Sequence, residues 1–149
     1  YADRLDPRQY RRWLSELAVG YVAVPQAKLD YAAETEAKLI ERGLDFLKEI
    51  PSGPGWKLYR VLGATPMVER PARLTGFETD GFTVDIPQPG TYRVRIRATP
   101  YWKVERGSAC VGRTGDGWTE VSTDVPGEVE VRARFSPGAR LADDPDCRT

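Results

Sequence analysis

Residues 87–135, PQPGTYRVRIRATPYWKVERGSACVGRTGDGWTEVSTDVPGEVEVRARF, hold the pattern that decides the fold. Within this stretch, short runs alternate apolar with polar residues, and Pro-Gly and Asp-Gly pairs separate the runs. Alternation with a period of two is typical of strands that bury one face, and these dipeptides are typical of tight turns. Short strands at this spacing predict an antiparallel β-sandwich. The residues expected to face its core include Phe82, Val84, Ile86, Tyr92, Val94, Val129 and Val131.

The preceding part of the chain has helical periodicity instead. Asp6-Pro7 is a typical helix start, and apolar residues follow it at spacings of three and four. A second helix is expected from Asp30 to Arg42, with Gly43 ending it, and the apolar residues at 44–50 suggest one or two further helical turns. The runs at 19–24 and 56–62 predict two strands. A helical crossover between two strands favours a small layer of βαβ type.

The change of period near Pro71 predicts the domain organisation. We expect an α/β subdomain at residues 1–70, a β-sandwich subdomain at 71–136 and a tail at 137–149. The predicted class is therefore α+β: a small N-terminal α/β layer, ordered helix-strand-helix-strand, followed by a C-terminal antiparallel β-sandwich.

Composition excludes several classes of function. The 149 residues include 22 Lys and Arg against 22 Asp and Glu, so no net charge attracts a nucleic acid. The chain has no His, which removes the commonest general base and the commonest zinc ligand. We find no metal-ligand spacing, cofactor motif or nucleophile elbow. We therefore expect no metal site, no cofactor and no enzymatic activity of the fragment itself.

Two groups of residues are candidate binding sites. Arg93, Arg95 and Arg97 alternate along one predicted strand and could form a strip that binds anions. The alternative is a solvated strand face, balanced by Glu128 and Glu130 on a neighbouring strand.

The second group is aromatic. Tyr101, Trp102 and Trp118 could form a platform on which sugar rings stack, which would make this a carbohydrate-binding module. The alternative is that Trp102 and Trp118 are core residues of a small sandwich. Burial is the expectation for Trp102, because it shares strand parity with Val104.

Three stretches give the chain a resemblance to a known group of proteins. These are residues 12–14 with 19–24 (RWL and VGYVAV), residues 56–61 (WKLYRV), and residues 100–104 with 117–118 and 126–131 (PYWKV, GW and PGEVEV). They resemble the extracytoplasmic C-terminal region of bacterial polytopic membrane proteins of the YfhO type and of the related GT-C glycosyltransferase-like families. The motifs are structural, and residues 105–107 (ERG) depart from the Asp-Gly that many of these relatives carry soon after the Trp.

The resemblance implies a cellular setting and a role. The chain would be a non-catalytic accessory domain at the extracytoplasmic face of the bacterial cell membrane, attached through transmembrane segments outside this sequence. The whole protein would be a glycosyltransferase acting on lipid-linked sugars. Catalytic residues of such enzymes lie between their membrane helices, so none carries over to this chain. A carbohydrate-binding sandwich module and a structural protein-interaction domain are the alternative roles.

Cys110 and Cys147 are the only cysteines. Their number alone leaves two free thiols and one disulfide equally open. The extracytoplasmic setting implied by the resemblance favours the disulfide.

We predict that Cys110 and Cys147 are bonded in the oxidised protein. The bond would close a loop of about 37 residues and, by loop-closure entropy, would stabilise the fold by about 3–4 kcal/mol. Thiol titration of the unfolded, unreduced protein should detect no thiol, and the reduced sample should give two. Two thiols before reduction would exclude the bond.

Overall fold

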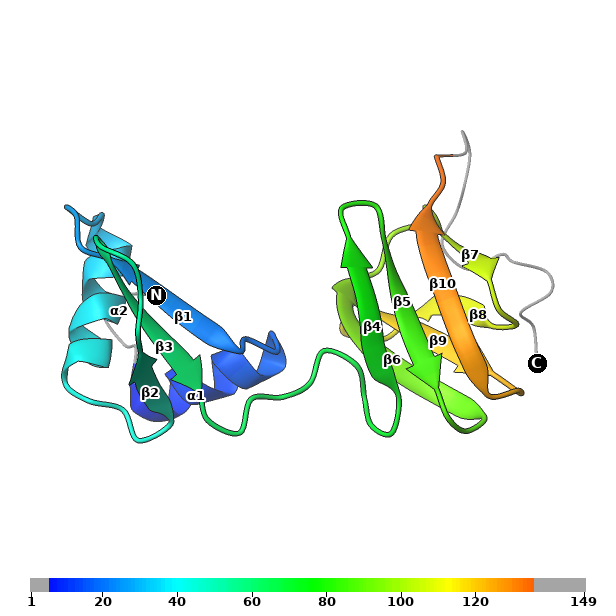
Figure 1. Cartoon of the computed structure of the whole chain (residues 1–149), viewed down its shortest axis with the longest axis horizontal. Coiled ribbons are helices and arrows are strands. Elements are labelled where there is room, and N and C mark those ends of the chain that lie inside the picture. The colour runs from blue at the N-terminus through cyan, green and yellow to red at the C-terminus, as the bar shows by residue number, and fades with distance from the viewer. Residues whose placement is uncertain (1–5, 136–149) are drawn as a thin grey trace. The chain divides into compact units, whose positions relative to one another are not determined.

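The computed structural model describes residues 6–135. The chain divides into two compact units, with the division between Thr65 and Pro66. The sequence placed this boundary near residue 70. The difference arises because Val68 forms a β-bridge with Val94, which joins the residues after Pro66 to the second unit. The predicted tail at 137–149 lies outside the described residues. Figure 1 shows the elements in chain order.

The described part of the first unit contains two helices and three strands. Asp6 caps the first helix, accepting hydrogen bonds from the backbone N–H groups of Arg8 and Gln9 at 2.8 and 2.9 Å. Asp30 caps the second by accepting one from Ala33 N–H at 2.8 Å. Both predicted helix starts are therefore confirmed. The elements are α1 (Pro7–Glu16), β1 (Tyr21–Pro25), α2 (Tyr31–Glu41), β2 (Leu47–Ile50) and β3 (Trp56–Val61).

The strands of this unit differ from the prediction in two respects. Residues 47–50 form strand β2 rather than further helical turns, and they pair antiparallel with β3. Residues 51–55, rich in Pro and Gly, join these two strands as a hairpin loop. The sheet order is β1-β3-β2 and β1 is also antiparallel to β3, so the expected βαβ arrangement is wrong.

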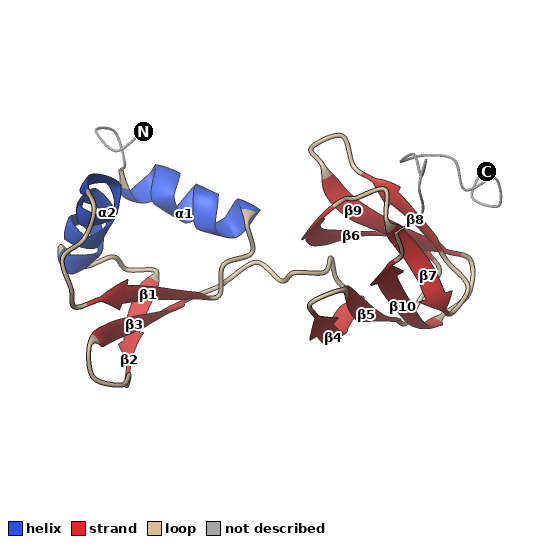
Figure 2. Ribbon diagram, turned by 90° about the horizontal axis from the view of Figure 1, so that it is seen from above, coloured by secondary structure: helices blue, strands red, loops and turns tan. Residues whose placement is uncertain are grey.

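Both helices lie on one face of this sheet, as Figure 2 shows. Of the apolar residues that helical spacing places on one face of α1, Tyr10 and Leu14 are almost completely buried, whereas Trp13 is 38% exposed. The Tyr10 hydroxyl donates to Glu36 Oε1 of α2 at 2.6 Å, and burial together with this bond raises the pKa of Tyr10 far above its usual value. The core between helices and sheet is completed by Leu39, Ile40, Leu44, Phe46, Tyr59 and Val61.

The second unit is a sandwich-like arrangement of two antiparallel sheets, as the sequence predicted. One sheet has the order β4-β5-β10-β7 and the other the order β6-β9-β8. The strands of the first sheet are β4 (Arg73–Glu78), β5 (Gly81–Ile86), β7 (Trp102–Arg106) and β10 (Gly127–Ala133). Those of the second are β6 (Gly90–Arg97), β8 (Cys110–Arg113) and β9 (Trp118–Thr123).

A core rich in valine lies between these sheets. Val84 and Val131 come from the first sheet and Val94 and Val121 from the second, and all four have no exposed surface. The predicted alternation is confirmed, because the apolar residues of β5, β6 and β10 belong to this core. The polar residues between them therefore lie on the outer faces, where the candidate sites are found.

Candidate functional site

The three arginines of β6 reach different partners. Arg93 Nη1 lies 3.2 Å from Asp116 Oδ2, and Arg97 Nη1 donates a hydrogen bond of 3.2 Å to the backbone oxygen of Asp116. Arg95 Nη1 instead donates to the Pro66 carbonyl at 2.9 Å. The predicted strip is thus divided: two of its guanidinium groups lie at the turn between β8 and β9, and the third lies against the chain at Pro66.

The expectation that Glu128 and Glu130 balance the charge of the β6 arginines is wrong. Both glutamates lie on β10, in the other sheet, and β10 pairs with β5 and β7 rather than with β6. Glu128 Oε1 lies 2.7 Å from Arg106 Nη2, and Glu130 Oε1 accepts from Arg132 Nε at 2.8 Å.

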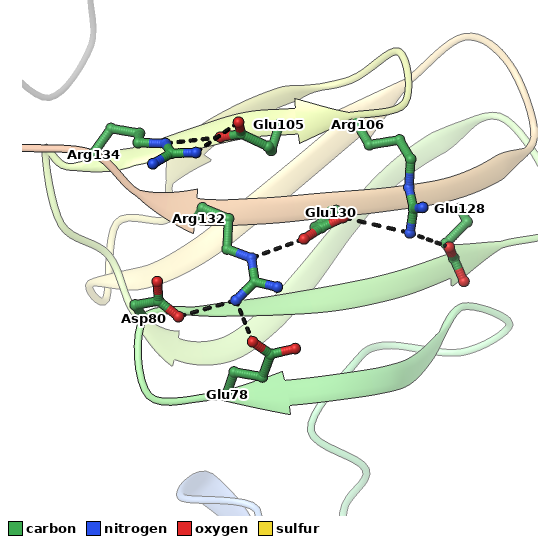
Figure 3. A network of polar contacts seen from close by, with 8 residues as sticks. All are labelled: Glu78, Asp80, Glu105, Arg106, Glu128, Glu130, Arg132 and Arg134. Carbon is green, nitrogen blue, oxygen red and sulfur yellow. Dashed lines mark hydrogen bonds and ion pairs between the residues drawn. The ribbon is translucent and has the colours of Figure 1, made fainter.

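These glutamates belong to an extended charge network on the first sheet, drawn in Figure 3. Arg132 contacts Glu78, Asp80 and Glu130, while Arg134 forms two hydrogen bonds to Glu105 at 2.7 and 2.8 Å. The bond from Arg134 lowers the pKa of Glu105. Each guanidinium group of the network has a carboxylate partner, so the network stabilises the strands across which it runs and leaves none of its guanidinium groups free for an anionic ligand. Its five carboxylates outnumber its three arginines.

The three aromatic side chains of the predicted platform do not share one surface. Trp102 packs edge-on against Phe82, with ring centroids 5.5 Å apart, and it is one of the residues packed against the core. Tyr101 lies beside Phe135, with centroids 5.6 Å apart. Trp118 lies on the other sheet, adjacent in sequence to the fully buried Thr119 and therefore on the opposite face of β9. A glycan platform built from all three rings has no support in this geometry.

The structure instead brings one member of each predicted group together. The guanidinium carbon of Arg97 lies 4.0 Å from the centroid of the Trp118 ring, a cation–π contact. A third arginine joins them. A Cβ atom built at Gly117 would lie 3.3 Å from Arg97 Nη1 and 3.6 Å from Arg113 Nη2, so both guanidinium groups flank this residue. We call Arg93, Arg97 and Arg113, with the turn at residues 114–118, the arginine cluster.

Hydrogen bonds hold the turn of the arginine cluster in place. The Thr114 hydroxyl donates to Asp116 Oδ1 at 2.6 Å and accepts from Trp118 N–H at 2.9 Å. Gly117 has a φ of 88°, in the region that favours glycine, and its N–H donates to the Thr114 carbonyl at 2.9 Å. The absence of a side chain at Gly117 also leaves room for the two guanidinium groups.

Positive charge exceeds negative charge within the arginine cluster. The Asp116 carboxylate is ion-paired with Arg93, and the Thr114 hydrogen bond, followed by Arg93 and Arg97, lowers the pKa of that carboxylate. Glu120 is the cross-strand neighbour of Arg93. Within the part of the chain that the structure describes, Arg113 has no ion pair with any carboxylate. Guanidinium groups bind phosphate and carboxylate through paired hydrogen bonds, so this cluster can accept an anionic group.

Sequence reasoning identified Arg93, Arg97 and Trp118 but missed Arg113 and the role of Asp116. Their assembly depends on the register of β6 and β9, which pairs Arg97 with Trp118 after a bulge that follows Val94. The Thr-Gly-Asp-Gly-Trp sequence at 114–118 was a visible signal of the turn.

No metal site is found among residues 6–135, where no three His, Cys, Asp or Glu side chains are grouped to hold an ion. Cys110 lies half-buried on β8, and Cys147 lies outside the described residues, so their predicted disulfide stays a prediction.

Comparison with known proteins identifies no relative. No family model, no curated protein and no solved structure matches this chain. Within the described residues, neither helix has the length and apolar character required to cross a membrane.

We predict that Thr114→Val raises the pKa of Asp116 toward the ordinary aspartate value, because the largest cause of its depression is the bond from Thr114. In the native protein the folded pKa lies below the unfolded one. The carboxylate therefore stabilises the fold above the unfolded pKa, and this stabilisation is lost as pH falls through the folded pKa. NMR titration of the Asp116 carboxyl carbon measures the shift. An unchanged pKa in Thr114→Val, with Thr75→Val as the control, would contradict the assignment.

Proposed function

We propose that this chain is a non-catalytic accessory domain of a polytopic membrane protein, placed at the extracytoplasmic face of the membrane, and that its second unit binds the anionic group of a ligand. A lipid-linked sugar carries such a group in its phosphate. The sequence resemblance supports the setting, and the arginine cluster supports the binding role.

The observation that carries the binding role is the convergence of Arg93, Arg97 and Arg113 on a turn with one carboxylate. Placing like charges together costs free energy unless an anion lies between them. A turn fixed by Thr114 holds them in place before the ligand arrives, which lowers the ordering cost of binding.

The protonation state of Asp116 favours binding over catalysis. A general acid or base that works near neutral pH needs a pKa close to that pH. The surroundings of Asp116 lower its pKa instead, so it remains a carboxylate. A charged carboxylate that bonds to Thr114 and Arg93 is suited to orienting guanidinium groups.

A module for neutral glycans is less well supported. Stacking of a sugar needs an open aromatic face, and the guanidinium group of Arg97 lies over the Trp118 ring. Stacking of a neutral sugar on that face of the ring would therefore require Arg97 to move away.

We predict that the chain binds glucose 1-phosphate and inorganic phosphate, with a Kd on the order of 1 mM, and does not bind glucose. Arg113→Gln and Arg97→Gln should each weaken phosphate binding about tenfold, because a hydrogen bond to a charged group is lost. Arg95→Gln is the matched control on the same strand, since Arg95 bonds to Pro66, and it should leave binding unchanged. NMR chemical-shift titration measures the Kd of each ligand for the wild-type chain and for the three variants.

Two results would contradict the binding role. One is equal binding of glucose and glucose 1-phosphate, which would favour the carbohydrate-binding module. The other is no binding of any of these probes by a folded chain, which would favour the structural or protein-interaction role.

The location is tested on the whole protein in its native cell. We predict that a cysteine-reactive reagent that cannot cross the membrane labels a cysteine placed at exposed Gly115 of intact cells. Labelling only after cell lysis would contradict an extracytoplasmic position. A full-length sequence without apolar segments of about 20 residues would contradict the polytopic membrane protein.

A further inference from the structure

The sheet of the first unit has a second face that neither helix covers. Residues that are opposite each other in antiparallel strands project from the same face. Cross-strand pairing therefore forms three rows on this face: Tyr21 with Arg60 and Lys48, Ala23 with Leu58 and Ile50, and Pro25 with Trp56. We call these eight residues the open face.

The residues of β3 that alternate with those of the open face show which face of the sheet the helices cover. Tyr59 and Val61 of β3 are buried in the core beneath the helices. Lys57 lies on that same side, where its Nζ is 3.6 Å from Glu41 Oε1 of α2. Leu58 and Arg60, which lie between them in sequence, therefore point the other way.

The open face does not have the composition of a solvated sheet surface. Six of its eight residues are apolar or aromatic, and the other two are cations. Trp56 is 51% exposed and Tyr21 is 60% exposed. An exposed sheet face normally carries polar residues in alternation, as the outer faces of the second unit do. An apolar group of this kind indicates a surface that binds a partner.

The charges of the open face select among partners. It carries Lys48 and Arg60 and no carboxylate, and neither cation is ion-paired with another described residue. A second copy of this chain packed face to face would bring cations against cations or leave them unpaired, because a twofold interface is self-complementary.

The interface of an anionic bilayer matches each row of the open face. Trp and Tyr rings favour the level of the lipid headgroups, Lys and Arg bind the headgroup phosphates, and aliphatic residues enter the boundary of the acyl chains. We propose that the open face docks the first unit on the surface of an anionic lipid membrane.

This docking is independent of the arginine cluster, which lies in the other unit. It requires only that the membrane carries anionic lipids, whereas the proposed function concerns a phosphate-bearing ligand. Because lipid phosphate could bind either surface, the test includes the variant Arg97→Gln/Arg113→Gln.

The experiment is co-flotation of the chain with vesicles of phosphatidylcholine containing about one third phosphatidylglycerol, compared with phosphatidylcholine alone. We expect the wild-type chain to float with the anionic vesicles and to bind less as salt concentration rises. Lys48→Glu/Arg60→Glu should weaken binding by about thirtyfold or more, since each cation near such a surface contributes about a factor of five. Trp56→Ser should weaken it by about tenfold.

Matched controls separate this face from the rest of the chain. Arg8→Glu/Arg12→Glu makes the same change of charge on α1, which lies on the other face of the sheet, and should have a much smaller effect. Phe77→Ser removes an aromatic residue of 64% exposure on β4 and should leave binding unchanged. Arg97→Gln/Arg113→Gln should weaken binding much less than the open-face variants do, whatever its effect on phosphate binding.

Three results would overturn the docking. One is no flotation of the folded wild-type chain with anionic vesicles. Another is equal loss of binding in the open-face variants and in the α1 control. The third is a lipid-free dimer that Trp56→Ser dissociates, which would assign the open face to a second copy. Circular dichroism of each variant shows that a loss of binding is not a loss of folding.

Discussion

A strand presents successive side chains to opposite faces, and this constraint governs the whole molecule. In the second unit, the residues of β5, β6, β9 and β10 that point inward form the valine-rich core, where Val84, Val94, Val121 and Val131 are fully buried. The same alternation obliges every second residue to point outward. Each sheet therefore has an outer face whose side chains make their contacts outside the core, and the three sheets among residues 6–135 differ in how they do so.

The outer face of β4-β5-β10-β7 is satisfied by opposite charges. Arg132, Arg134 and Arg106 each bond to carboxylates on that face, so none of these guanidinium groups is free to bind an anion. The outer face of β6-β9-β8 has an excess of guanidinium groups around Asp116. The open face of β1-β3-β2 carries apolar and aromatic residues with two cations. The second face can therefore accept an anionic group and the third an apolar surface, so these two faces need different partners.

Local features of the fold could be predicted from the sequence, and pairing could not. The caps at Asp6 and Asp30 and the alternation in β5, β6 and β10 depend on neighbouring residues, so they were found. Strand β2 was missed because it has only four residues, and the apolar residues around it fit either period.

The order of strands could not be read from local patterns. Glu128 and Glu130 looked like natural partners for the arginines of β6, but the position of β10 beside β5 and β7 places them in the other sheet. The contact between Arg97 and Trp118 likewise depends on a bulge in the pairing of β6 with β9. Sequence therefore identified Arg93, Arg97 and Trp118 without showing that they meet, and it missed Arg113.

The two proposed surfaces would act together if both bind the same membrane. A phosphate site with a Kd on the order of 1 mM would be nearly empty with a dilute ligand in free solution. If the ligand is held in a membrane and the open face holds the first unit on that membrane, the ligand and the arginine cluster share a thin layer. Their effective concentration then exceeds the bulk value, with no new contact at the cluster. A weak, exposed cluster such as Arg93, Arg97 and Arg113 is therefore sufficient for a domain held at a membrane surface, and a deep pocket is not required.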